Sequence, residues 1–217
     1  MSITASVDFD NRSGDVTLPG HTGVATHSLV FMLGGITTRW KQTVAYYFTG
    51  NSTDGNVFST IVLDIIKRCH DIGINVAAVT SDMGSSNRAM WKKLGIVCGK
   101  KAITTNSFSH PCNPHKKVCV LADVPHVIKN IRNHLVNGQY IFLPQKIVQQ
   151  FNLPCNKVSI EPLKQLVEYQ KDKDLKPAPN LTAKHLEPAH FDKMKVSHAL
   201  NIFSNSVSAG LGLMVES

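Results

Sequence analysis

Apolar residues recur with a strand-like period along the first part of the chain. Between Ile3 and Phe9 every second residue is apolar, which is typical of a strand with one buried face. Apolar runs over Ser28–Ile36 and Val44–Phe48 predict two more strands, and the link between them has the length of a loop. The first quarter of the chain therefore predicts a group of antiparallel strands.

The period changes to that of a helix over Asn56–Asp71. The apolar residues of this segment fall at the spacing of one helix face: Phe58, Ile61, Val62, Ile65, Ile66 and Cys69. Asp54 or Asn56 is a candidate N-cap, and Gly73 marks the end. We expect an amphipathic helix that packs on the preceding strands.

A buried strand, an acid and a second helix follow in close succession. Val76–Val79 is a short apolar run that predicts a core strand, and Asp82 comes where that strand would end. The turn residues from Gly84 to Asn87 then lead into a short helix with an apolar stripe, which Gly95 closes. Chemistry in open α/β sheets gathers at the carboxyl ends of strands, so Asp82 is a candidate functional acid. The alternative is that Asp82 only caps the helix.

The next segment predicts one more strand and helix. Gly99–Lys117 has little periodicity and predicts a loop, whereas Val118–Ala122 is an apolar strand that ends at Asp123. Pro125 suits the first turn of a helix. The buried face of that helix is predicted to hold Val127, Ile128, Ile131 and Leu135, with Lys129, Arg132 and His134 elsewhere.

Beyond Gln139 the pattern is helical, with no evident strand. Pro144–Phe151, Ile160–Gln170 and Phe191–Leu213 predict three helices. The last of these carries an apolar stripe of Val196, Leu200, Phe203, Val207 and Leu211. The order of elements predicts an α/β fold over residues 1–138 and a mostly α-helical segment over residues 139–217. The first part has the element order of the ribonuclease-H-like fold, a mixed sheet with helices packed on it, although other α/β folds begin in the same way.

Charge and cysteine content narrow the class of protein. The formal net charge is +8 at pH 7, which favours polyanionic partners such as nucleic acid, although the basic residues are scattered along the chain. The five cysteines are odd in number and irregular in spacing, which predicts free thiols in a reducing compartment. No signal-peptide pattern opens the chain and no segment reaches transmembrane length, so we expect an intracellular protein without a membrane partner.

Several polar groups are further candidates for function. His110, Cys112, His115 and Cys119 could ligate zinc, but their spacing matches no standard pair. Asp123, with His126 close behind it, could support a site near Asp82 or could simply cap its helix. No Gly-rich Walker-type motif occurs.

Scattered polar and basic positions have two interpretations. Trp40-Lys41, Lys92-Lys93 and Lys100-Lys101 could contact nucleic-acid phosphates or could be ordinary exposed surface. Lys193, Lys195 and Asn201, on the last predicted helix, are more simply explained as solvated surface.

Four stretches resemble the P-element-type transposases, which include the THAP-domain transposases. They occur in the order of that family and cover nearly the whole chain: LVFMLGG with TTRWKQTVAYYFTG (within Leu29–Gly50), VTSDMGSSNRAMWKKLGI (Val79–Ile96), VCVLADVPHVIKNIRNHL (Val118–Leu135) and KHLEPAHFDKMKVSHALNIFSNSVSAGL (Lys184–Leu211).

The resemblance implies a nuclear enzyme that cuts and joins transposon DNA. Its ribonuclease-H-like domain is interrupted by a mostly helical GTP-binding insertion, and two Asp and one Glu hold the metal ions, Mg²⁺ by implication. Two metals activate the attacking oxygen and stabilise the leaving one, which requires several carboxylates at one point. Asp82 resembles the second Asp and is thereby implied to be a catalytic metal ligand. The resemblance also implies transposon-end DNA, a homo-oligomer and an intact transposase as partners.

The sequence departs from the family pattern at the other two acids. The first Asp of the family lies in an Asp-Glu-Met stretch, of which Met1 resembles the last residue, while Asp8 and Asp10 come too late to replace it. The Glu follows the insertion, and this chain ends inside what resembles the insertion. The zinc-dependent DNA-binding module of the family is also absent. We therefore expect a truncated transposase that binds Mg²⁺ and GTP weakly and neither cleaves nor joins DNA alone. The alternative is a non-catalytic regulator that binds DNA or an intact transposase.

Overall fold

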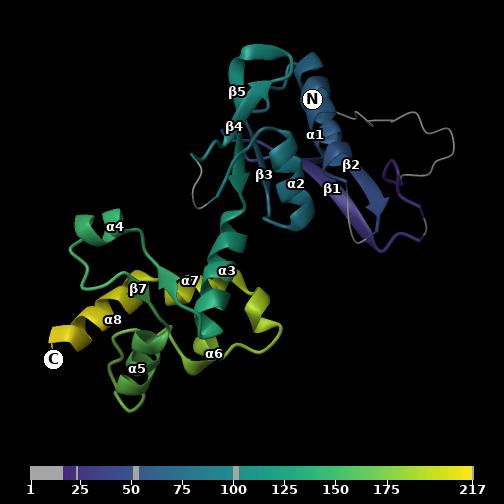
Figure 1. The fold of residues 1–217 in the computed structure, drawn as a ribbon. Helices are drawn as coiled ribbons and strands as arrows, with labels where there is room; N and C mark the ends of the chain where they lie inside the picture. Colours follow the sequence, from purple (N-terminus) through teal and green to yellow (C-terminus); the bar gives the residue numbers. More distant parts are fainter. Residues whose placement is uncertain (1–16, 23, 51–53, 100–102, 217) are drawn as a thin grey trace. The chain divides into compact units, whose positions relative to one another are not determined.

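A computed structural model describes residues 17–22, 24–50, 54–99 and 103–216 (Figure 1). The strand predicted over Ile3–Phe9, together with Asp8 and Asp10, lies outside the described residues. The chain divides into two compact units, Met1–Leu121 and Ala122–Ser217. A functional domain boundary at residue 138 stays a prediction.

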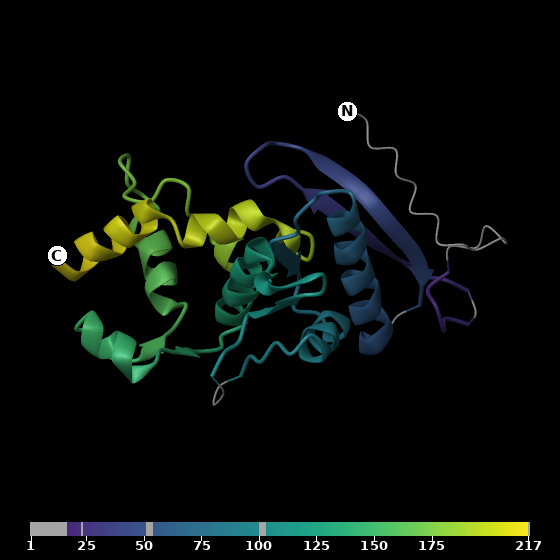
Figure 2. The ribbon, with the colours of Figure 1, turned by 90° about the horizontal axis from the view of Figure 1, so that it is seen from above.

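The first unit holds two pieces of β-sheet and two helices. The strands β1 (His27–Gly34) and β2 (Lys41–Thr49) pair antiparallel, as the sequence predicts. Helix α1 (Gly55–Asp71) packs against this hairpin, as both views show (Figures 1 and 2). The side chains that join the hairpin to α1 include Phe31, which meets Phe58 edge-on with the ring centroids 5.7 Å apart. Three further strands, β3 (Ala78–Ser81), β4 (Ser107–His110) and β5 (Asn113–Ala122), form a second sheet in the order β3-β5-β4.

The predicted helix boundaries of the first unit are confirmed to within a residue or two. Helix α1 is capped by Asp54, whose Oδ1 accepts the N–H of Asn56 at 2.8 Å. Strand β3 (Ala78–Ser81) lies two residues later than its apolar run, and α2 (Ser85–Lys93) follows it. Met90, Trp91 and Leu94 are buried as predicted, and Gly95 has the positive φ expected after a helix end.

The loop predicted over Gly99–Lys117 is wrong in its second half. Strand β4 (Ser107–His110) pairs antiparallel with β5 (Asn113–Ala122), which begins before the apolar run Val118–Ala122. Backbone hydrogen bonds hold this hairpin where the side chains are mostly polar, so the hydrophobic period on which the prediction rested is missing.

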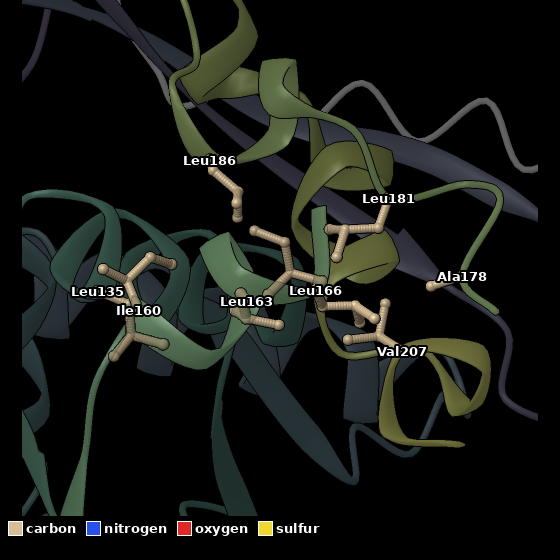
Figure 3. Close-up of a cluster of buried hydrophobic side chains, with 9 residues drawn as sticks. Leu135, Ile160, Leu163, Leu166, Ala178, Leu181, Leu186 and Val207 are labelled. Atoms are coloured by element: carbon tan, nitrogen blue, oxygen red, sulfur yellow. The ribbon is translucent and has the colours of Figure 1, made fainter. Parts of the chain in front are cut away.

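The second unit begins with α3 (Val124–Val136) and is mostly helical. Pro125 lies in the first turn of α3, as predicted. The other α-helices are α4 (Gln145–Gln150), α5 (Glu161–Tyr169), α6 (Ala183–Leu186), α7 (Val196–Ile202) and α8 (Asn205–Glu216). Figure 3 shows the core of this unit, where buried Leu166 lies among Leu163, Leu181 and Val207.

Two predictions of secondary structure in this unit are wrong. A short antiparallel pair, β6 (Ile141–Phe142) and β7 (Lys157–Val158), lies where no strand was expected. The single helix predicted over Phe191–Leu213 is instead a 3-10 turn, η1 (Asp192–Met194), followed by α7 and α8. Ser204 lies at the break between α7 and α8, and its hydroxyl donates to the carbonyl of Asn201 at 2.8 Å.

That break changes which residues are buried. Leu200 and Phe203 of the predicted apolar stripe are exposed, whereas Ala199 and Ile202 are the buried residues of α7. None of the described helices is long and apolar enough to cross a membrane.

Candidate functional site

Asp82 lies between the end of β3 and the start of α2. Ser81 closes the strand, and Gly84 occupies the N-cap position of the helix. The carboxylate of Asp82 is therefore at the carboxyl end of a strand, which is where α/β sheets place reactive groups.

Two hydrogen bonds hold one oxygen of the Asp82 carboxylate. Its Oδ1 accepts the backbone N–H of Gly84 at 2.7 Å and the side-chain amide of Asn87, also at 2.7 Å. A Cβ at position 84 would lie 2.9 Å from that oxygen, so any larger residue there would require the carboxylate to shift. The sequence predicted only turn residues from Gly84 to Asn87, whereas the structure shows a turn built around the Asp82 carboxylate.

A further hydrogen bond joins α2 to the end of β3. Trp91 Nε1 donates to Ser81 Oγ at 3.0 Å. Asn87 and Trp91 are four residues apart and so lie on the same face of α2. This face of the helix therefore contacts the last strand residue and the acid that follows it.

The residues around Asp82 fit one ligand position of a Mg²⁺ site rather than a whole site. Mg²⁺ takes oxygen ligands in octahedral geometry and is usually bound through carboxylates. Within the described ranges, no group of three or more His, Cys, Asp or Glu side chains could hold a metal ion. Any further carboxylates would have to come from outside these ranges, so no catalytic step follows from this geometry.

Asp123 caps its helix, which confirms that interpretation of the sequence. Its Oδ2 accepts the N–H of His126 at 3.3 Å, at the N-terminus of α3. The ring nitrogen Nε2 of His126 is 3.8 Å from the same oxygen. Asp123 belongs to the second unit, so the structure gives no distance from it to Asp82.

The four residues considered for zinc do not form a metal site in the described structure. His110 is 2% exposed, and its Nδ1 accepts the backbone N–H of Cys112 at 3.1 Å. Its ring meets that of His70 edge-on, with centroids 5.4 Å apart. Burial, followed by the nearby His70 and Lys116, lowers the pKa of His110. The spacing of these residues reflects the β4–β5 hairpin.

A buried polar cluster in the second unit was missed by the sequence analysis. Arg132 was placed away from the buried face of its helix, but it is 0% exposed. Its Nη2 donates to the carbonyl of Lys193 at 2.7 Å and to that of Asp192 at 3.4 Å. Arg132 is four residues after Ile128 and three before Leu135, so its position on the buried face was readable from the spacing.

Two histidines and an amide extend this cluster. The rings of His185 and His198 have centroids 4.8 Å apart, and His185 Nε2 is 3.1 Å from the side-chain amide nitrogen of Asn201. Burial, and then the neighbouring His198, lowers the pKa of His185. The prediction that Asn201 is solvated surface is therefore wrong, whereas Lys193 and Lys195 are exposed as expected.

Lys195 nevertheless has a partner in this cluster. Its Nζ is 2.8 Å from Asp192 Oδ1, and this hydrogen bond is the main cause that lowers the pKa of Asp192. Of the lysines considered for phosphate contacts, Lys41, Lys92 and Lys93 are exposed, while Lys100 and Lys101 lie outside the described residues. Exposure is compatible with either interpretation of these lysines.

Comparison with known proteins shows two adjacent matches. Residues 1–95 match the TNP-like RNase H N-terminal domain, and residues 125–217 match the TNP-like GTP-binding insertion domain. The transposable element P transposase of Drosophila melanogaster is 27% identical over 215 residues, which are 97% of this chain and 25% of that protein. The human DNA transposase THAP9 is 28% identical over 196 residues, which are 90% of this chain and 20% of that protein.

A solved structure agrees in fold. The Drosophila P element transposase strand transfer complex superposes with a TM-score of 0.72 at 24% identity, over 89% of this chain and 39% of that one. This likeness supports the ribonuclease-H-like sheet followed by a helical insertion. The chain spans a quarter or less of the length of the two curated relatives. With an RNase H N-terminal domain followed by a GTP-binding insertion domain, the chain belongs to the TNP-like family of P-element-type transposases.

Proposed function

We propose that this chain is part of a P-element-type DNA transposase in which Asp82 is one of the metal-binding catalytic carboxylates. The observation that carries the proposal is the position of Asp82 at the carboxyl end of β3, within the segment that matches the RNase H N-terminal domain. Mg²⁺ bound there would activate an attacking oxygen and stabilise a leaving one in DNA cleavage and strand transfer. By analogy with the relatives, transposon-end DNA, assembly with further transposase copies and a nuclear location belong to the same proposal.

This polypeptide alone is not proposed to cut DNA. The two-metal reaction needs several carboxylates at one point, and within the described ranges no group of three or more His, Cys, Asp or Glu side chains could hold a metal ion. That same observation supports a second candidate function, a non-catalytic regulator that binds DNA or an intact transposase. The basic net charge of +8 suits contact with DNA phosphates in either case.

The test begins with the transcript that encodes this chain. The protein that it specifies is expressed, and Mg²⁺-dependent nicking of DNA from the flanks of the coding sequence is measured. Asp82→Ala should lower the nicking rate at least about 100-fold, because losing even a supporting contact of a metal site costs 10–100-fold. Asp54→Ala is the matched control, since Asp54 caps α1 and should leave the nicking rate close to that of the wild type.

Three outcomes separate the candidates. If Asp82→Ala nicks DNA like the wild type, Asp82 is not a metal ligand. If the wild-type protein does not nick but retards the DNA in a gel, with a retardation that falls as salt is raised, the regulator is supported. If it neither nicks nor retards DNA, DNA cleavage and DNA binding are both excluded for the expressed protein, and only binding to an intact transposase is left of the two candidates.

GTP binding by the second unit is a separate part of the proposal. The match of residues 125–217 to a GTP-binding insertion domain supports it, although the described structure identifies no contact residues. Calorimetry with GTP, and with ATP as the control, should show weak binding that favours GTP. Equal heats from the two nucleotides would contradict this part alone.

A further inference from the structure

The contacts of α2 with the end of β3 suggest a role for Asn87 that family membership alone does not assign. We propose that Asn87 is a positioning residue for Asp82: its side-chain amide fixes the carboxylate in the orientation needed for metal binding. The proposal rests on the metal-ligand role of Asp82 proposed above. It concerns a side chain that neither binds the metal nor contacts the substrate.

The chemistry of the contact fixes the orientation of the Asn87 amide. Both oxygens of an ionised carboxylate are acceptors only, so the group 2.7 Å from Asp82 Oδ1 must be the amide nitrogen of Asn87. A hydrogen bond to an ionised acceptor is stronger than one between neutral groups, so it favours one rotamer of the acid over the others. The carbonyl oxygen of the Asn87 amide consequently does not face the carboxylate.

Asn87 is itself held in place by the packing of α2. It occupies the first turn of the helix, one turn before Trp91, which is buried and bonded to Ser81. Met90, next to Trp91, is 1% exposed. The amide therefore projects from a helix that is anchored on the same strand end as the acid. A ligand supported in this way by a rigid element is how metal sites keep their geometry.

Gly84 completes the arrangement from the backbone side. Its N–H donates to the same oxygen, Oδ1, at 2.7 Å. One oxygen of Asp82 thus receives two donors, one from the backbone and one from a side chain. Removing the backbone donor would require proline at position 84, which also restricts the turn, whereas the Asn87 donor can be removed by changing a side chain alone, which makes Asn87 the testable member of the pair.

The test compares Asn87→Leu with Arg88→Leu in the whole chain. Leucine is close to asparagine in size but donates no hydrogen bond, and Arg88 is exposed on the same helix. Side-chain coupling constants from NMR report the χ1 rotamers of Asp82. We expect one rotamer in the wild type and in Arg88→Leu, several in Asn87→Leu, and a return toward one in Asn87→Gln, which keeps the amide. A single Asp82 rotamer in a folded Asn87→Leu protein would overturn the proposal.

A variant of the acid tests the same contact even if Asn87→Leu does not fold. In Asp82→Ala the side-chain amide signals of Asn87 should move toward those of a solvated asparagine, whereas in Asp54→Ala they should not move. Unchanged Asn87 signals in Asp82→Ala would overturn the proposal without any need for the leucine variant.

Addition of Mn²⁺ separates this proposal from the proposed function. Millimolar Mn²⁺ should broaden the amide signals around Asp82 in the wild type, and Asn87→Leu should need about 10-fold more metal for equal broadening. No broadening around Asp82 in the wild type counts against the metal-ligand role itself. Broadening at equal metal concentrations in the wild type and Asn87→Leu counts against Asn87 alone.

Discussion

One charged side chain in each unit, Asp82 in the first and Arg132 in the second, differs in burial and in how far along the chain its hydrogen-bond partners lie. In the first unit, Asp82 is half-buried at a strand end, and the two hydrogen-bond donors to its Oδ1, from Gly84 and Asn87, lie within five residues along the chain. In the second unit, Arg132 is fully buried, and the carbonyls that it contacts are sixty and more residues away along the chain. Local contacts shape an accessible group that is available for chemistry, whereas long-range contacts stabilise a polar group inside a core. The difference marks Asp82 as a candidate for function and Arg132 as a structural residue.

Arg132→Ala should have the largest effect on stability. It removes a buried side chain and leaves the carbonyls of Asp192 and Lys193 without their donor, so we expect the second unit to lose about 3 kcal/mol. Hydrogen exchange of peptides from the second unit measures the loss. Both tryptophans, Trp40 and Trp91, lie in the first unit, so their fluorescence in urea should be unchanged.

Asn130→Ala is the control for that experiment, because Asn130 is an exposed residue of the same helix. Its effect should stay within about 0.5 kcal/mol of zero. If amide hydrogens of the second unit exchange at the same rates in Arg132→Ala and Asn130→Ala, the buried guanidinium does not stabilise the unit. Arg132 would then not be the structural residue that distinguishes this unit from the one that holds Asp82.

The second largest effect should come from the approach of α1 to α2 in the first unit. A Cβ at Gly55 would lie 2.8 Å from the Cβ of Ala89, so Gly55→Ala should cost about 1–3 kcal/mol through overpacking. Tryptophan fluorescence during urea unfolding measures this cost.

Gly212 in α8 is the matched control, since a Cβ there meets nothing within 4 Å. Gly212→Ala should instead stabilise the second unit by about 0.5–1 kcal/mol, measured by hydrogen exchange. The same sign for both variants would show that close packing does not distinguish these glycines.

The sequence predicted elements well where local chemistry specifies them. The cap by Asp54, the helix end at Gly95 and the position of Asp82 after β3 all follow from neighbouring residues. It failed where distant partners decide the outcome. The spacing allows Arg132 on the buried face of α3, but the carbonyls that accept its hydrogen bonds are far along the chain, and β4 forms because β5 pairs with it. Neither partner is visible in a local hydrophobic pattern. The Asn87 contact was missed because an asparagine that only forms a turn cannot be told in sequence from one that donates a hydrogen bond to a carboxylate.

The histidine cluster predicts how the stability of the second unit depends on pH. Burial lowers the pKa of His185 below the value of about 6.5 expected in the unfolded chain. As the pH falls below about 6.5, His185 therefore takes up a proton in the unfolded state before it does so in the folded state. Stability is therefore complete above about pH 6.5 and is lost as the pH falls from there through the lowered pKa of the folded state. We expect the total change to be smaller than the effect of Arg132→Ala.

His185→Gln tests this dependence, because glutamine keeps hydrogen-bonding capacity but does not titrate. Hydrogen exchange of the second unit, referenced to unstructured peptides at each pH, should show a flatter pH profile in this variant than in the wild type. His134→Gln is the control, since His134 is exposed on α3. If stability changes with pH equally steeply in His185→Gln and in the wild type, groups other than His185 cause the loss of stability in acid.

The smallest predicted effects compare one helix cap in each unit. Asp54 accepts the Asn56 N–H at 2.8 Å, whereas Asp123 accepts the His126 N–H at 3.3 Å, so the second hydrogen bond is the weaker. Asp54→Ala should destabilise the first unit by about 1 kcal/mol, measured by tryptophan fluorescence, and Asp123→Ala should destabilise the second by less than that, measured by hydrogen exchange. A larger loss for Asp123→Ala than for Asp54→Ala would mean that Asp123 does more than cap α3, which would reopen the interpretation of Asp123 as a supporting residue of the site around Asp82.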